Sequence, residues 1–132
     1  MVDVRIEIVE GPLGESRSAP RCAGAGASVV FEGIVRGLED GTTIEALDYE
    51  AYMPMAERQL HALATEIGAA HAITLIRAEH STGRVPVGAC SFRLMVAAPH
   101  RAEALVAMGE FIDRMKRDVP IWKFVAPTPA RP

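Results

Sequence analysis

The stretch that decides the fold is Cys90–Val125, CSFRLMVAAPHRAEALVAMGEFIDRMKRDVPIWKFV, because its apolar residues change period twice. Over 90–98 they alternate with their neighbours, which predicts a strand with Cys90 in the core. From 99 to 118 they recur every three or four positions, which predicts a long helix. Pro120 ends this helix, and 121–125 is predicted to be extended, with Trp122 as its anchor. The predicted apolar stripe of the helix comprises Leu105, Met108, Ile112, Met115 and Val119.

Towards the N-terminus, the same two periods predict four more strands and one more helix. The predicted strands cover 2–8, 27–35, 43–52 (with a bulge between Ala46 and Leu47) and 72–79, and the helix runs from Pro54 to Gly68. The predicted loops cover 11–26, 37–41 and 81–88. Strands in clusters with two packed helices indicate an α+β fold with a mainly antiparallel sheet. We expect a single domain over residues 1–125 and a flexible, proline-rich tail over 126–132.

Composition excludes several classes of protein. The chain has 132 residues and a net charge of −3, so no basic surface for nucleic acid is indicated. Its four histidines show no metal-binding spacing, so neither a metal nor another cofactor is expected. No apolar run is long enough to span a membrane, and the start does not resemble a signal peptide, so the cytoplasm is the expected compartment.

The two cysteines do not indicate a disulfide scaffold, which would carry more of them. Cys22 lies in a predicted loop and could be a nucleophile, but an incidental thiol is the simpler interpretation. Cys90 is on the apolar face of its strand and is expected in the core.

The two lysines of the chain lie close together. The sequence has twelve arginines but only Lys116 and Lys123, both next to the turn at Pro120. Lysine can transfer a proton or attack a carbonyl once its pKa is lowered, whereas arginine stays charged. The turn can bring Lys123 back towards Lys116, with Arg114 and Arg117 as cationic neighbours. We therefore take Lys116 and Lys123 as candidate catalytic residues, with chance placement on a solvated helix end as the alternative.

Three further cationic residues are candidates for binding an anion. Arg36 ends a predicted strand, and His100 and Arg101 open the second helix, where backbone N–H groups favour anions. If they gathered in this acidic chain they would form a local anion site. Taken one at a time, each is more often a plain surface charge.

Four sequence blocks resemble the molybdopterin synthase large subunits of the MoaE type. They are 31–36 (FEGIVR), 47–57 (LDYEAYMPMAE), 97–101 (AAPHR) and 116–123 (KRDVPIWK), in the order and spacing of that family. The resemblance covers about residues 27 to 123, and its Pro-Ile-Trp-Lys and Tyr-Glu-Ala-Tyr motifs are specific.

The resemblance implies an α/β hammerhead fold and a sulfur-transfer function. It implies a central homodimer with one small ubiquitin-like sulfur-carrier subunit at each end, whose C-terminal Gly-Gly thiocarboxylate enters a pocket. The substrate would be cyclic pyranopterin monophosphate, converted to the dithiolene of molybdopterin in molybdenum cofactor biosynthesis. Lys116 would meet the thiocarboxylate and Lys123 would act on the precursor. Arg36, His100 and Arg101 would bind the precursor, the last two from the neighbouring subunit.

The sequence departs from the family pattern at three places. Ser81 stands where the family commonly has arginine, Phe124 and Val125 replace a basic or polar residue and a glutamate, and the tail is short. Phe124, Val125 and the short tail favour one alternative, a catalytically weak or silent homologue that acts as a partner-binding scaffold. The two lysines disfavour it, since an inactive site does not need lysine. A second alternative is an unrelated pterin- or nucleotide-phosphate enzyme with His80 or His100 as its base.

Overall fold

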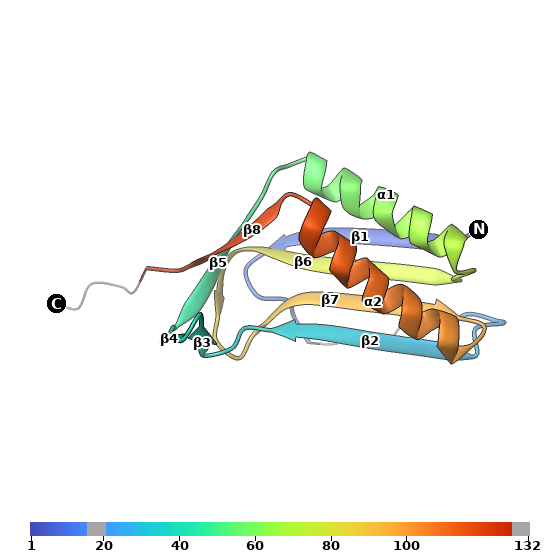
Figure 1. The fold of residues 1–132 in the computed structure, drawn as a ribbon, viewed down its shortest axis with the longest axis horizontal. Coiled ribbons are helices and arrows are strands. Elements are labelled where there is room, and N and C mark those ends of the chain that lie inside the picture. Colours follow the sequence, from blue (N-terminus) through green and yellow to red (C-terminus); the bar gives the residue numbers. More distant parts are fainter. Residues whose placement is uncertain (16–20, 128–132) are drawn as a thin grey trace.

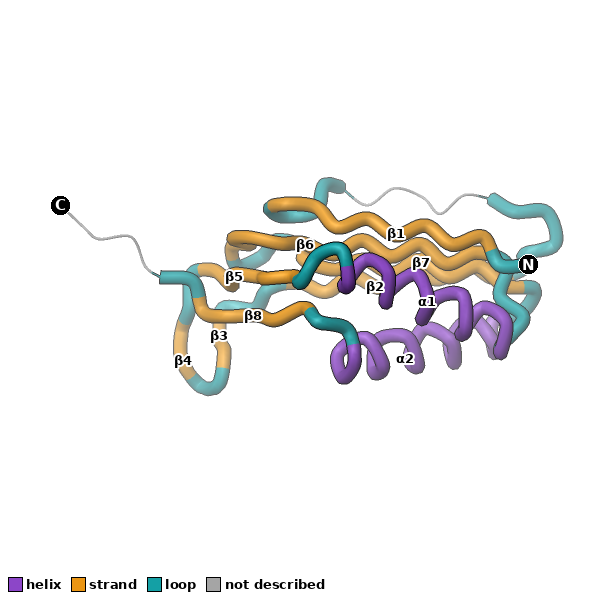
Figure 2. Tube along the Cα trace, turned by 90° about the horizontal axis from the view of Figure 1, so that it is seen from above, coloured by secondary structure: helices purple, strands orange, loops and turns teal. Residues whose placement is uncertain are grey.

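The computed structural model describes residues 1–15 and 21–127, which form one main sheet with two helices on one of its faces (Figure 1). Its strands are β1 (Asp3–Glu10), β2 (Ala27–Ile34), β3 (Leu38–Glu39), β4 (Thr42–Thr43), β5 (Ala46–Ala51), β6 (Leu75–Pro86), β7 (Cys90–Ala98) and β8 (Ile121–Val125). The helices are α1 (Met55–Ala70) and α2 (Arg101–Asp118). Figure 2 shows both helices on the same side of the strands. The predicted α+β class is confirmed.

The main sheet has the strand order β2-β7-β6-β5-β8, and β1 pairs in parallel with β6. All its other pairs are antiparallel. β6 changes partners along its length, since its first part pairs with β1 and β7 and its last part with β5. β2 and β8 therefore form the two ends of this strand path.

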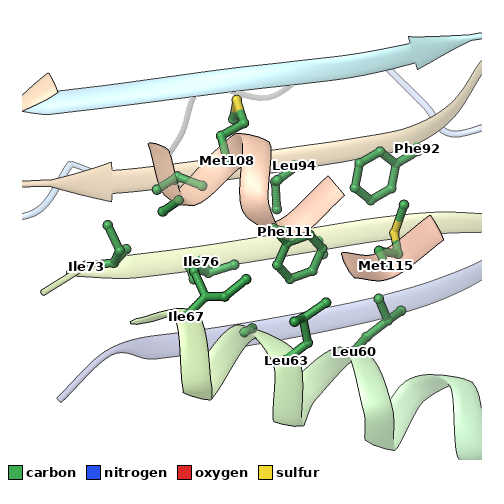
Figure 3. Packing of buried hydrophobic residues seen from close by; sticks show 14 of the residues in the cluster. Leu60, Leu63, Ile67, Ile73, Ile76, Phe92, Leu94, Met108, Phe111 and Met115 are labelled. Atoms are coloured by element: carbon green, nitrogen blue, oxygen red, sulfur yellow. The ribbon is translucent and has the colours of Figure 1, made fainter. Parts of the chain in front are cut away.

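The core lies between the helices and the sheet. The helical period that predicted α1 is confirmed, because its apolar residues Leu60 and Ile67 are fully buried. In Figure 3, the Phe111 ring of α2 lies over β6, and it belongs to the same buried cluster as Leu63 of α1 and Ile76 of β6. Cys90 is buried, as predicted. The alternation predicted for β7 is confirmed by four residues of one parity in the core: Phe92, Leu94, Val96 and Ala98.

The stripe predicted for α2 was partly wrong. Met108 and Met115 are buried, but Leu105 is 56% exposed. The buried face instead passes through Ala104, Ala107 and Phe111. Small alanines let the helix lie close to the sheet, and the large Phe111 ring fills the remaining space. The helix therefore turns Leu105 outwards.

Three boundary predictions were wrong because contacts with distant segments override local sequence signals. The segment 81–86 is not a loop but the continuation of β6, whose backbone finds a partner in β5. β5 has no bulge at Ala46, and the irregular residues lie before it, at 44–45. Gly68 does not end α1, because it packs against Val2 of the N-terminal segment, where a Cβ atom would lie 2.6 Å from Val2 Cγ1.

The predicted turn at 37–41 is a short hairpin formed by β3 and β4. Asp40 and Gly41 at its tip both have positive φ, 49° and 80°. That pair of conformations is typical of a tight Asp-Gly hairpin turn. In Figure 1 the hairpin lies at the same end of the molecule as β5 and β8.

The far face of the sheet carries a buried arginine. Arg93 is 3% exposed, and its guanidinium donates to Glu32 Oε2 at 2.9 Å and to the Gly14 carbonyl at 2.6 Å. It also lies 3.5 Å from Glu79 Oε2. These bonds hold the segment after β1 against the strands, which helps to explain why β7 is buried on both faces.

Candidate active site

A pocket of about 560 Å³ opens where the ends of β2 and α2 meet β5 and β8. Three cationic residues from three parts of the chain line it: Arg36, Lys116 and Lys123. We call this group the cationic wall. The structure therefore brings together three of the five predicted site residues, including both lysines.

The elements around Pro120 place the two lysines. Lys116 lies in the last turn of α2, next to Met115, which is anchored in the core. The chain leaves the helix after Val119, whose N–H donates to the Met115 carbonyl. It then pairs with β5, and this register sets Lys123 opposite Tyr49. The return of Lys123 towards Lys116 was predicted, but Trp122 does not anchor it, because Trp122 is 51% exposed.

Lys123 has an ionic partner that the sequence did not indicate. Its Nζ lies 3.1 Å from Glu39 Oε1, and the Glu39 side chain is 19% exposed against 54% for Lys123. Glu39 comes from the β3–β4 hairpin, far away in sequence. The pair holds the ammonium group at the pocket.

Lys116 differs from Lys123 in its surroundings. Among the described residues, neither Lys116 nor Arg36 forms an ion pair. The predicted cationic neighbours are both paired with carboxylates: Arg114 with Glu66 at 2.9 Å, and Arg117 with Asp118 at 3.0 Å. Their charges are therefore largely offset, and Lys116 and Arg36 remain available to an anion.

The pocket also has an uncharged part, which we call the neutral wall: Tyr49, His80, Ser91 and Phe92. The Tyr49 hydroxyl hydrogen-bonds the Ser91 hydroxyl at 3.0 Å. The His80 ring meets the Tyr49 ring edge to face, with centroids 5.3 Å apart. Burial lowers the pKa of His80 below its ordinary value, because an imidazolium loses its hydration there.

His100 and Arg101 lie elsewhere in the chain. They begin α2, and Lys116 lies in its last turn, which separates them by about 22 Å along the helix axis. The His100 N–H donates to the Glu103 carboxylate, and His100 Nδ1 lies 3.2 Å from it, so this residue also caps the helix. Within one chain these two residues do not reach the pocket.

Sequence reasoning missed Glu39, Tyr49 and Ser91, and it named His80 only for an alternative function. An acidic residue beside an Asp-Gly turn is usually a solvated charge in a loop, so nothing in the sequence indicated that Glu39 contacts Lys123. Tyr49 lies in a block that matched the family, which marked the segment but not the contact with Ser91.

Two further findings concern the described part of the chain. No group of three or more His, Cys, Asp or Glu residues in it could hold a metal ion. None of its helices is long and apolar enough to cross a membrane.

The family model described as "MoaE protein" matches residues 10–118. A protein of Oryza sativa subsp. indica named molybdopterin synthase catalytic subunit is 42% identical over 99 residues, covering 75% of this chain and 51% of the relative. The chain thus spans about half the length of the curated relatives it matches first.

Two solved structures align with most of this chain. Molybdopterin synthase from Staphylococcus aureus aligns with a TM-score of 0.81 and 37% identity, covering 89% of this chain and 87% of that one. A complex of subunits 1 and 2 of the molybdopterin-converting factor from Helicobacter pylori aligns with a TM-score of 0.73 and 25% identity, covering 91% and 83%.

Proposed function

The chain belongs to the MoaE protein family, and we propose on this basis that it is the catalytic subunit of a molybdopterin synthase. It would transfer sulfur from the thiocarboxylated C-terminus of a small ubiquitin-like subunit to cyclic pyranopterin monophosphate, forming the dithiolene. The observation that carries the proposal is the convergence of Lys116, Lys123 and Arg36 on one pocket. Both reactants are anions, and the cationic wall offers charge to each.

The lysines have separate roles in this proposal. Lys116, whose ammonium has no ion pair among the described residues, binds the thiocarboxylate and acts as proton donor and acceptor when the acyl C–S bond is cleaved. Lys123 acts on the precursor as a proton donor and acceptor, and Arg36 binds the cyclic phosphate as a bidentate donor. The sulfur bonds to a precursor carbon as a C–O bond at that carbon breaks, and the departing oxygen leaves as water with a proton from Lys123. Water then cleaves the acyl C–S bond, and the partner leaves with an ordinary carboxylate. A second partner delivers the second sulfur in the same way.

Glu39 fits this scheme as a positioning residue. Its carboxylate holds the Lys123 ammonium at 3.1 Å, so the lysine reaches the precursor from a defined direction. Glu39→Gln would keep a hydrogen-bonding group there but remove the charge.

We propose that His100 and Arg101 serve the pocket of a second copy. β2 is an end strand of the sheet, and it exposes Val30 and Ile34. Antiparallel pairing of two β2 strands about a twofold axis would set the beginning of one beside the end of the other. Because Ala27 pairs with Ala98, just before α2, this would bring His100 and Arg101 of one copy towards Arg36 of the other.

The proposal includes the small subunit as partner and the cytoplasm as compartment. The Helicobacter pylori neighbour is a complex of two subunits, which supports a partner for this chain. A thiocarboxylate, like a thiol, is easily oxidised, and the cytoplasm is reducing. The alternative, a weak or silent scaffold, is favoured by Phe124 and Val125, which are more than half exposed where the family commonly has polar residues.

One reconstitution separates these two functions. The purified chain is mixed with a thiocarboxylated small subunit and the precursor, and products are followed by mass spectrometry. The enzyme should yield a dithiolene and a small subunit in which oxygen has replaced the terminal sulfur. A chain that binds the small subunit while both masses stay unchanged would support the scaffold instead.

A further inference from the structure

The neutral wall contains a histidine with a fixed proton position. His80 is 6% exposed, and its ring lies between Tyr49 and Phe92, with centroids 5.3 and 5.7 Å away. Its Nδ1 lies 2.8 Å from the Ser81 carbonyl oxygen. A carbonyl oxygen can only accept a hydrogen bond, so Nδ1 carries the proton.

The other ring nitrogen is therefore an acceptor. Burial keeps the imidazole neutral, which leaves a lone pair on Nε2. Within the described residues Nε2 has no hydrogen-bond partner, and it is not one of the fully enclosed polar atoms without a partner. Because His80 lines the pocket, this lone pair is open to a bound molecule.

The two walls differ in the ligand chemistry that they suit. Arg36, Lys116 and Lys123 suit anionic groups, whereas the rings and hydroxyls of the neutral wall suit a flat heterocycle without charge. A reduced pterin is such a heterocycle, and it carries several N–H donors. An N–H donor that is buried against His80 loses its hydrogen bonds to water, and this costs free energy unless an acceptor such as Nε2 replaces them.

We infer that the neutral wall binds the pterin ring of the precursor and that His80 Nε2 accepts a hydrogen bond from one of its N–H groups. The inference rests on the proposed function and adds a residue that selects the heterocycle, while the cationic wall takes the phosphate. Tyr49 and Phe92 then hold the imidazole at a fixed angle, and the Tyr49–Ser91 bond holds Tyr49.

The first test measures precursor binding to the whole chain by calorimetry. His80→Phe keeps a ring but removes the acceptor, and His80→Gln restores an acceptor oxygen close to the place of Nε2. The same two changes at His61, an exposed residue of α1, are the matched controls. His80→Phe should weaken binding by about tenfold to a hundredfold, since a buried donor loses its partner. His80→Gln should recover part of that loss, and the His61 variants should bind normally.

Unchanged binding by folded His80→Phe, or an equal loss in both His80 variants, would overturn the inference. A wild-type chain that does not bind the precursor would instead overturn the proposed function itself.

A second measurement needs no variant. Nitrogen NMR of the wild-type chain with labelled histidine should show one neutral imidazole with an unprotonated Nε2. Adding the precursor should shift that Nε2 signal in the direction of hydrogen bonding, and inorganic phosphate alone should not. An Nε2 chemical shift that stays unchanged when the chain is saturated with the precursor would also overturn the inference.

Discussion

Mixing two inactive variants, Arg101→Ala and Lys116→Ala, should restore activity if each site draws on both subunits. The structure makes the test sharp, because the two residues lie at opposite ends of α2, about 22 Å apart along its axis. Lys116 lines the pocket of its own chain, and Arg101 does not. Arg101 can therefore serve a pocket only in another copy.

The recovered activity follows from counting sites. Random exchange of equal amounts of the two variants makes about half of all dimers mixed. In each mixed dimer, one pocket has a normal Lys116 and the neighbour's normal Arg101, while the other pocket lacks both. About a quarter of all sites are thus intact, so dithiolene formation should return to about a quarter of the wild-type rate.

The assay mixes the purified variants under conditions that exchange subunits and follows the rate of product formation. Each variant mixed with itself is the control and should stay inactive. Mixed dimers that stay as inactive as their parents, although exchange is shown by native mass spectrometry, would refute the reasoning and place Arg101 outside the site.

Three further outcomes are expected. Phe111→Ala should cost about 3–5 kcal/mol in urea unfolding, because it removes a fully buried ring from the core; a loss below about 1 kcal/mol would contradict the packing described. Burial lowers the pKa of His80, so the unfolded chain takes up that proton first as the pH falls. The stability that the neutral His80 contributes is therefore fully present above about pH 6.5 and decreases from there down to the folded pKa. Between pH 7.5 and 5.5, the melting temperature of the wild type should fall further than that of His80→Gln. Cys22→Ser should leave turnover unchanged, because the partner supplies the sulfur; a folded variant without turnover would mean that this thiol takes part.

The sequence predicted those parts of the fold whose periodicity is local. The predictions from the alternation in β7 and from the helical spacing in α1 were correct, because each element turns one face of apolar residues towards the same core. The loop predicted at 81–86 was wrong, because the pairing of this segment with β5 depends on the position of a strand that is distant in sequence. The predicted buried face of α2 was wrong at Leu105, because the small residues Ala104 and Ala107 face the sheet in its place.

The same division holds for the site. Lys116 and Lys123 were found because they are the only lysines and flank a turn. Glu39 was not found, since its contact with Lys123 joins a hairpin to a distant strand. The neutral state of His80 depends on its burial, and the position of its proton depends on the Ser81 carbonyl; neither can be seen in the sequence.

The central claim is that Lys116 and Lys123 perform chemistry and do not merely supply charge. Arginine at either position keeps the charge and most of the length, but its pKa above about 12 prevents proton transfer. The most direct test is the rate of dithiolene formation by Lys116→Arg and Lys123→Arg, each shown to be folded and to bind the small subunit. The account predicts losses of about 10²–10⁴-fold for each, the usual cost of a lost general acid or base. A near-normal rate in either variant would contradict it and return that lysine to anion binding.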